Sequence, residues 1–297
     1  MEEVYEKLSQ ENKDRIEKIF GSLDNILQPP SYKCEEDRPL VIYSIAMSVK
    51  SETDLTGLRV IQVKNPTAPK NFEDMWGFNF IRLLSDAYIS SGANLRTGAI
   101  FPTKFENYGF DVELDDGTPM ILHRGKKRLA IRTRKVDESK EHMTEYYKRK
   151  PALAKYYNWT LYTEEAKLDD EHVQYLENNE LHSSESGSSG LNIVEDLYLN
   201  KGCQTVIAEA GPKTCHKYFK KGQAAQNPFD VIYLALHFGV VDKENLVYGD
   251  ECAIDFLAPE EAEDSEYNLR DGFEIVHEQD EEVGGAKWRY YVLHKKV

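Results

Sequence analysis

The chain has 297 residues, of which 40% are hydrophobic and 30% charged, and its formal net charge is -15. This hydrophobic content is sufficient for a real core, either in one large domain or in two small ones. The negative charge disfavours phosphate-rich partners, because nonspecific nucleic-acid binding needs Lys and Arg to neutralise phosphates, and it makes a protein partner the default expectation.

Cysteine usage and hydropathy both indicate a cytoplasmic protein. The four cysteines, Cys34, Cys203, Cys215 and Cys252, lie far apart without a CxxC pair, so we expect buried thiols. The stretch 1–20 is amphipathic and acidic, unlike a signal peptide, and no window approaches the roughly 18 apolar residues that span a bilayer. The sequence therefore predicts a cytoplasmic location and no membrane partner.

The N-terminal part of the chain mixes helical and strand patterns. Residues 3–27 carry apolar side chains at helical spacing and predict one or two helices that end before Pro29. Residues 39–47 are continuously apolar and residues 58–63 alternate, so both predict strands. Apolar residues recur every three or four positions across 71–90, which predicts a buried helix.

A small β meander is expected next. Residues 110–114 read as a strand that the turn Asp115-Asp116-Gly117 closes, with 120–123 and 129–133 as its neighbours. Because the acidic pair lies in this turn, we predict no metal site there, or elsewhere in the chain.

A polar break divides the predicted domains. Residues 137–180 predict a helix and then a strand at 159–162, after which the Ser- and Gly-rich stretch 181–190 predicts a flexible loop. We therefore expect an α+β region at 1–180, with a helical start and the central meander, and a second region at 191–297.

Helical and strand patterns alternate in the C-terminal region. The pattern predicts helices or turns at 191–199, 213–220 and 243–247, and strands at 204–208, 229–236 and 252–257. Such alternation is typical of a parallel sheet covered by helices, and 272–276 with 288–293 would add an antiparallel edge pair. The predicted fold class is α/β, with a Rossmann-like, methyltransferase-like C-terminal sheet beside the α+β region.

A Rossmann-like sheet raises the question of a cofactor. The strand 227–234 is of the kind that ends beside a ligand in such sheets, yet the sequence has no GxGxG turn to approach S-adenosylmethionine. If a cofactor is bound, its candidate residues are Glu209, which follows a strand as a ribose-binding acid does, together with Asp230 and His237. The alternative is a degenerate sheet with no cofactor and no catalytic residue.

The strongest charge feature is a basic run within an acidic chain. Seven basic residues fall within twelve positions: Arg124, Lys126, Lys127, Arg128, Arg132, Arg134 and Lys135. Between 251 and 283 there are 13 acidic residues and one basic residue. Opposed patches steer protein encounters, so the basic residues are the candidates for partner binding, with RNA binding and a solvated strand pair as alternatives.

Several segments, taken in order, resemble the dynein axonemal assembly factor 3 family. The segments are Glu11–Phe20, Tyr108–Leu114, Lys155–Tyr162, Asn192–Leu197, Gln204–Ile207 and Asn227–Leu234. The resemblance implies a noncatalytic cytoplasmic factor that helps to preassemble axonemal dynein arms for cilia and flagella. It also implies a methyltransferase-like C-terminal region without a cofactor, and dynein chains as protein clients.

The leading hypothesis from the sequence is thus a noncatalytic assembly or adaptor protein. The first alternative is an S-adenosylmethionine-dependent methyltransferase with Glu209, Asp230 and His237 near the cofactor. The second is an RNA-binding module that uses residues 124–135.

Overall fold

The computed structural model describes ten stretches of the chain: 2–32, 38–62, 67–96, 108–133, 135–149, 153–163, 179–183, 190–209, 215–247 and 250–297. Contacts divide the chain into two compact units made of interleaved segments. Unit 1 comprises Met1–Gln10, Asp37–Pro39 and Asn79–Glu209, and unit 2 comprises Glu11–Glu36, Leu40–Phe78 and Ala210–Val297. The units are therefore not contiguous in sequence, whereas the sequence analysis expected one boundary at 181–190.

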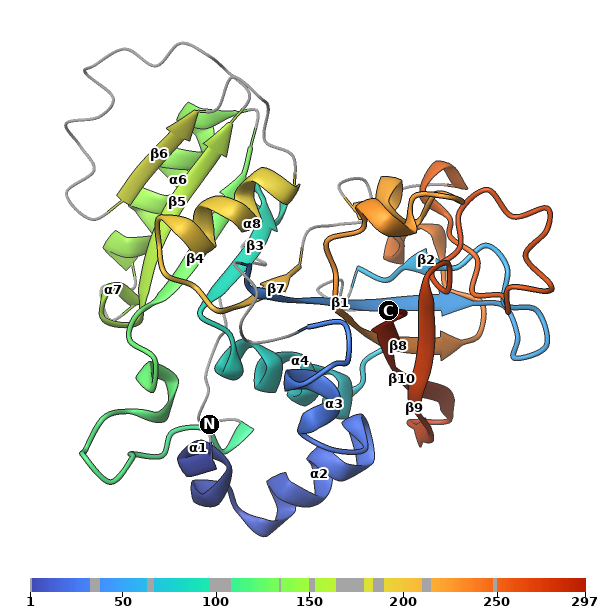
Figure 1. Cartoon of the computed structure of the whole chain (residues 1–297), viewed down its shortest axis with the longest axis horizontal. Coiled ribbons are helices and arrows are strands. Elements are labelled where there is room, and N and C mark those ends of the chain that lie inside the picture. The colour runs from blue at the N-terminus through green and yellow to red at the C-terminus, as the bar shows by residue number, and fades with distance from the viewer. Residues whose placement is uncertain are drawn as a thin grey trace. The chain divides into compact units, whose positions relative to one another are not determined.

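Unit 1 contains a parallel sheet. Its strands are β3 (Ala87–Ser91), β4 (Lys127–Arg132), β5 (Tyr157–Thr163), β6 (Asn179–Ser183) and β7 (Thr205–Ala208). They lie in the order β6-β5-β4-β3-β7, and each neighbouring pair is parallel (Figure 1). Parallel strands need crossover connections, and helices supply most of them here.

Helices cover both faces of the unit 1 sheet. The helices of unit 1 are α1 (Glu2–Lys7), the end of α4 (Phe72–Leu84), α5 (Gly92–Arg96), α6 (Val136–Arg149), α7 (Leu153–Tyr156) and α8 (Gly190–Leu199), with a 3-10 turn at Met120–Leu122. Tyr162 of β5 contacts α8, whereas Thr133, just after β4, contacts α6. Because Thr133 follows the residue that pairs with Tyr162, these two contacts lie on opposite faces.

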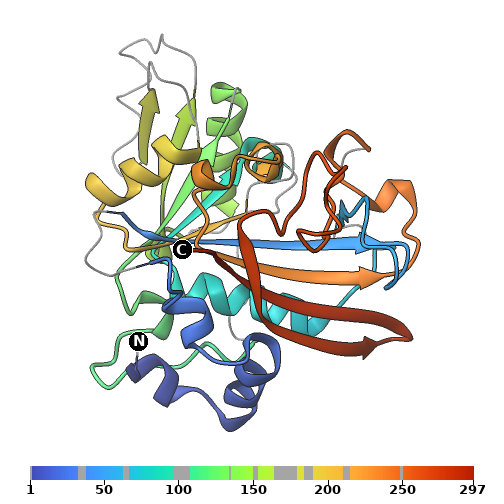
Figure 2. The same cartoon turned by 45° about the vertical axis from the view of Figure 1, so that its right-hand side comes forward.

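Unit 2 contains a mixed sheet. Its strands are β1 (Leu40–Val49), β2 (Arg59–Val60), β8 (Val231–Phe238), β9 (Phe273–Val283) and β10 (Ala286–Lys295). Their order is β2-β1-β8-β10-β9, in which β1 and β8 are parallel and the other pairs are antiparallel. Figure 2 shows blue β1, orange β8 and the long red hairpin of β9 and β10 side by side. Both β1 and β8 are apolar and almost wholly buried, as central strands are.

Short helices and turns complete unit 2. The α-helices are α2 (Gln10–Phe20), α3 (Asp24–Leu27) and the start of α4 (Phe72–Leu84), which continues into unit 1. The 3-10 turns lie at His216–Phe219, Ala224–Gln226, Lys243–Asn245 and Asp250–Cys252. None of the helices in the described part of the chain is long and apolar enough to cross a membrane.

Several predicted elements need correction. The helix expected at 71–90 ends at Leu84, where the Ser85 hydroxyl caps the Ile81 carbonyl, and the rest of that apolar stretch is strand β3. The meander is wrong, because residues 110–114 form no strand and residues 120–122 form a 3-10 turn. The third member of the expected meander belongs instead to β4, which pairs in parallel with β3 and β5.

Three further predicted elements differ in part from the structure. Residues 181–183 of the expected loop belong to β6 and Gly190 begins α8, while 184–189 lie outside the described residues. The strand expected at 252–257 forms only isolated bridges. Of the helix expected at 213–220, residues 216–219 form a 3-10 turn, and 213–214 lie outside the described residues.

Candidate functional site

The parallel strands of unit 1 end side by side. Ser91 at the end of β3 lies opposite Arg132 at the end of β4, and Arg132 lies opposite Tyr162 of β5. On the other side of β3, Ala208 pairs with Ile89, so the next residue, Glu209, lies beside Ser90. Ligands of open α/β sheets bind outside the carboxyl ends of strands. We call Ser90, Ser91, Arg132, Thr133 and Glu209 the carboxyl row, which crosses from β7 to β4.

A buried ion pair fixes one end of the carboxyl row. The Arg82 guanidinium, near the end of α4, donates to both carboxylate oxygens of Glu209 at 2.5 Å, and both side chains are at least 94% buried. Burial alone would lower the pKa of Arg82, but the Glu209 carboxylate outweighs it and raises that pKa. The Arg82 guanidinium also lies 5.7 Å from the Tyr88 ring centroid. Arg82 therefore occupies one acceptor position on each oxygen of the Glu209 carboxylate.

The middle of the carboxyl row is shaped by short polar side chains. The Ser91 hydroxyl accepts the backbone N–H of Asn94 at 3.2 Å and so caps α5. The Asn94 amide donates to the Ser90 hydroxyl at 3.1 Å and to the Glu209 carbonyl at 3.3 Å. These contacts hold the start of α5 against the ends of β3 and β7.

The turn from β4 to α6 is basic and well ordered by hydrogen bonds. Thr133 donates its N–H to the Tyr162 carbonyl at 2.9 Å, and its hydroxyl accepts the N–H of Lys135 at 3.0 Å. Arg132 is half-buried, whereas Lys135 is exposed and pairs with Glu138 at 2.7 Å. Arg132 and Lys135 therefore place two basic side chains at the carboxyl end of β4.

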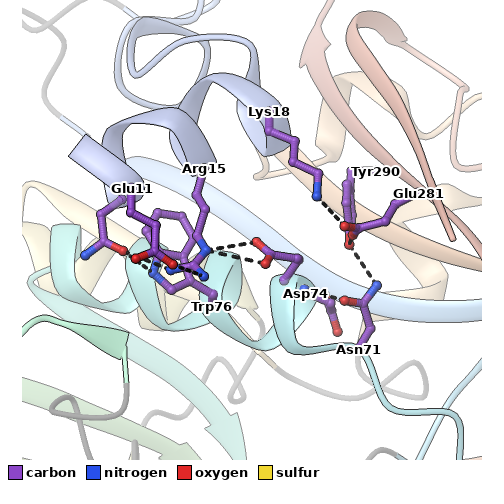
Figure 3. Close-up of polar contacts among 10 residues, drawn as sticks. Glu11, Arg15, Lys18, Asn71, Asp74, Trp76, Glu281 and Tyr290 are labelled. Carbon is purple, nitrogen blue, oxygen red and sulfur yellow. Dashed lines mark hydrogen bonds and ion pairs between the residues drawn. The ribbon is translucent and has the colours of Figure 1, made fainter. Parts of the chain in front are cut away.

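A second group of interacting polar residues lies in unit 2, around the start of α4 (Figure 3). The Asn71 side chain caps α4 by accepting the N–H of Asp74 at 3.2 Å, and its amide donates to the Tyr290 hydroxyl at 2.8 Å. The Tyr290 hydroxyl donates to Glu281, which forms an ion pair with Lys18 of α2. These five residues, with Tyr233 of β8, are called the α4 cluster below.

Asp74 is the most perturbed group of the α4 cluster. Its side chain is buried, and the Tyr233 hydroxyl donates to its Oδ1 at 3.5 Å. Burial raises the pKa of Asp74 to about 7, against the opposing effect of the Tyr233 hydrogen bond. Gly77 lets the phenol approach, because a Cβ at that position would lie 2.9 Å from the Tyr233 oxygen. A carboxyl group near its pKa at neutral pH is typical of functional sites.

Helix α2 is tied to α4 by a separate set of contacts, which are also visible in Figure 3. Arg15 forms ion pairs with Glu73 at 3.2 Å and with Glu11 at 2.7 Å. The Trp76 indole N–H donates to the Asn12 side-chain oxygen at 3.0 Å. The first two turns of α4 therefore have polar partners on both α2 and the hairpin.

Two of the three residues expected around a cofactor, Asp230 and His237, lie at opposite ends of one strand. Glu209 belongs to unit 1, whereas this strand, β8, belongs to unit 2. The Asp230 carboxylate accepts the N–H of Val41 at 3.0 Å, at the amino end of the strand. At the carboxyl end, His237 Nδ1 and the Ser48 hydroxyl are 3.1 Å apart, and burial lowers the pKa of His237.

The basic run is divided by β4. At its amino end, Arg124 pairs with Asp86 at 3.3 Å, Lys126 is exposed, and Lys127 is fully buried with its amine donating to the Leu83 carbonyl at 2.8 Å. Burial lowers the pKa of Lys127 to about 7.

The rest of the run lies along β4 or at its far end. Arg128 donates to the Thr160 hydroxyl at 3.1 Å, and Arg132 and Lys135 stand at the carboxyl end. Arg134 lies outside the described residues. The run therefore forms no single patch among the residues that the structure describes.

Sequence reasoning missed Arg82 and Asp74. Both are charged residues within a run whose apolar spacing predicts a buried helix, and that mismatch was the available signal. Among the described residues, no group of three or more His, Cys, Asp or Glu side chains is placed to hold a metal ion.

Comparison with known proteins identifies the fold. No family model matches the sequence, and no curated protein matches it. A pyrimidine reductase-like protein from Corynebacterium diphtheriae shares 14% identity at a TM-score of 0.52, over 95% of this chain and 99% of that one. RibD from Acinetobacter baumannii shares 12% identity at a TM-score of 0.50, over 88% of this chain and 58% of that one. The riboflavin biosynthesis reductase Rib7 of Saccharomyces cerevisiae shares 10% identity at a TM-score of 0.49, over 92% and 96%.

These comparisons contradict the family resemblance drawn from the sequence. None of the named structures is a dynein assembly factor or a methyltransferase. The predictions of a noncatalytic assembly factor with dynein clients, of a methyltransferase and of an RNA-binding module are therefore wrong. The prediction of no cofactor is also contradicted, because the chain shares its fold with a protein named as pyrimidine reductase-like. Short strand and helix patterns recur across unrelated α/β proteins, which explains the misleading segments.

The α/β class itself is confirmed, but its methyltransferase-like form is not. The expectation of a protein partner stays a prediction. The chain has the fold of the pyrimidine reductase-like protein over nearly the whole length of both molecules.

Proposed function

We propose that this protein is a reductase that uses a phosphorylated nicotinamide dinucleotide to reduce a small heterocyclic substrate of pyrimidine type. The whole-length similarity to a protein named as pyrimidine reductase-like supports the reaction class. The carboxyl row is the observation that supports the cofactor, because it joins three neighbouring strand ends with a basic turn. From β7 to β4 these strand ends span about 10 Å, at the usual spacing of about 4.8 Å between strands.

The residues present suit a dinucleotide that carries an additional phosphate. In many α/β proteins an acid at a strand end accepts the ribose hydroxyls, whereas a nearby Arg accommodates a 2′-phosphate. Here the Glu209 carboxylate forms a buried pair with Arg82, and Arg132 and Lys135 supply positive charge at the end of β4. The reduced nicotinamide ring, when bound, would supply the hydride.

In this proposal each polar residue has a distinct task. Arg132 and Lys135 bind phosphate, and the serine hydroxyls of β3 orient the ligand across the strand ends. The Asn94 amide holds α5 against those strand ends, and Arg82 holds Glu209 in place. The α/β scaffold presents these groups from rigid strand ends, which reduces the ordering cost of binding.

Calorimetry with NADPH tests the proposal. Wild-type protein should bind NADPH with a saturable signal, and Arg132→Gln should weaken binding roughly 10- to 100-fold, the usual loss of a charge-assisted hydrogen bond. Lys126→Gln is the matched control, because this exposed lysine belongs to the same basic run at the opposite end of β4. Absence of heat with wild-type protein at millimolar NADPH, or equal losses in the two variants, would overturn the proposal.

A further inference from the structure

The α4 cluster gathers its ionisable groups from every element packed against the start of α4. Asp74 on the helix faces Tyr233 from β8 and Tyr290 from β10, and the next charged group is Glu281 of β9. Lys18 of α2 balances the charge of Glu281 through a direct ion pair. The cluster is therefore neutral while the Asp74 carboxyl holds a proton.

The neighbouring acid of the same turn has its own cation. Glu73 forms its ion pair with Arg15 of α2, which in turn pairs with Glu11. Ionisation of Asp74 therefore adds a buried negative charge to a cluster whose cation, Lys18, already serves Glu281. An uncompensated buried charge is costly unless it regains water or a partner.

The hydrogen bonds of the first turn of α4 show how the free-energy cost of a buried Asp74 carboxylate can be relieved. Asn71 joins the turn to β10 through the Tyr290 hydroxyl, and Asp74 joins it to β8 through the Tyr233 hydroxyl. If residues 71–75 move away from the hairpin, the Asp74 carboxylate is hydrated and both of these single hydrogen bonds break. Such local opening needs far less free energy than unfolding of unit 2.

We propose that the first turn of α4 and the β9–β10 hairpin form a proton-controlled latch, closed while the Asp74 carboxyl is protonated and loosened when it ionises. This inference does not depend on the proposed reductase activity. It concerns the local equilibrium between a closed and an open first turn, which the protein carries with or without a ligand.

The size of the effect follows from the two pKa values of Asp74. The pKa of the Asp74 carboxyl is about 7 in the closed turn, and its ordinary value is 3.8 when the carboxyl is hydrated. Because the closed state binds the proton more tightly, its advantage is full below pH 3.8, declines as pH rises and is lost above pH 7. Between pH 5.5 and pH 8.0 the closed-to-open ratio should fall about 30-fold.

Hydrogen exchange on the full chain measures this ratio directly. After normalisation for the intrinsic pH dependence of exchange, protection of residues 71–78 should fall about 30-fold in wild-type protein between pH 5.5 and pH 8.0. In Asp74→Asn the same protection should change by less than about threefold, because the amide does not titrate. Glu73→Gln is the matched control in the same turn and should retain the wild-type decrease.

A second measurement keeps the proposal open to refutation if Asp74→Asn does not fold. The carboxyl carbon resonance of Asp74 in wild-type protein should titrate near neutral pH. A midpoint near 4, an unchanged protection in wild-type protein, or an equal decrease in a folded Asp74→Asn variant would each overturn the latch.

Discussion

Removal of one partner from the buried pair of Arg82 and Glu209 should destabilise unit 1 severely. Arg82→Met leaves the Glu209 carboxylate buried without its two guanidinium donors, since the side chains are only 4% and 6% exposed. An uncompensated buried charge of this kind costs about 3–5 kcal/mol. Since whole domains are stable by about 5–15 kcal/mol, the loss should be visible as a large shift of the urea midpoint.

The double variant Arg82→Met with Glu209→Leu separates charge from packing. Replacing both partners with apolar side chains of similar volume should return the free energy of unfolding to within about 1.5 kcal/mol of wild type, because no charge remains buried. Lys135→Met is the control for an exposed pair, since Lys135 and Glu138 are 59% and 47% exposed. Its effect should stay below about 1 kcal/mol.

Urea unfolding with two probes provides the measurement. Circular dichroism reports the whole chain, and fluorescence of Trp159, which is buried in unit 1, reports the unit that holds the pair once Trp76 and Trp288 of unit 2 are replaced by Phe. A loss below 1 kcal/mol in Arg82→Met would refute the reasoning, because it would mean that water reaches the Glu209 carboxylate. A double variant as unstable as the single one would instead assign the effect to packing.

Two further predictions concern buried groups that pack against α4. Burial lowers the pKa of Lys127 from 10.5 to about 7, so between pH 7 and pH 9 the unfolded chain binds more protons than the folded chain. In urea titrations the stability of wild-type protein should therefore rise by about 2 kcal/mol relative to Lys127→Met from pH 7 to pH 9. A stability difference that stays constant over this range would contradict the buried amine. Gly77→Ala gains about 0.5–1 kcal/mol of helix propensity but places a Cβ 2.9 Å from the Tyr233 oxygen, an overpacking cost of about 1–3 kcal/mol. Thermal melts should therefore show net destabilisation that Tyr233→Phe partly relieves, and a stabilised Gly77→Ala would contradict the close approach.

Sequence patterns were sufficient for elements whose signal is local. Three predicted elements appear in the structure near their expected positions. They are the apolar strand β1, the strand β8 and the antiparallel pair at the C-terminus. The helix at 71–90 was extended too far, because a short buried strand such as β3 has the same apolar content as a buried helix. Strand order could not be predicted, since β8 pairs with β1 across most of the chain.

The candidate site was less accessible to sequence reasoning. Glu209 is a candidate cofactor-binding residue in the sequence because it follows a predicted strand. Its partner Arg82 lies 127 positions earlier in the chain, within a helix that is predicted from its apolar spacing alone. Asp74 was passed over for the same reason, although a carboxylate in a buried helical face always needs an explanation. Charge within an apolar stripe is thus a better indicator of a site here than charge density.

The basic run shows that a high density of charge in the sequence does not by itself locate a site. Its density suggested one interaction surface, yet β4 separates Arg124 and Lys126 from Arg132 and Lys135, and it buries Lys127 between them. Only the residues at the carboxyl end stand where ligands of parallel sheets bind. The two ends of helix α4 contribute to different groups of residues. Asp74 in its first turn belongs to the α4 cluster, whereas Arg82 in its last turn pairs with Glu209. Lys127 also donates to the Leu83 carbonyl, and its amine can make this hydrogen bond whether it is charged or neutral, so the last turn of α4 should keep its buried partners when the first turn loosens.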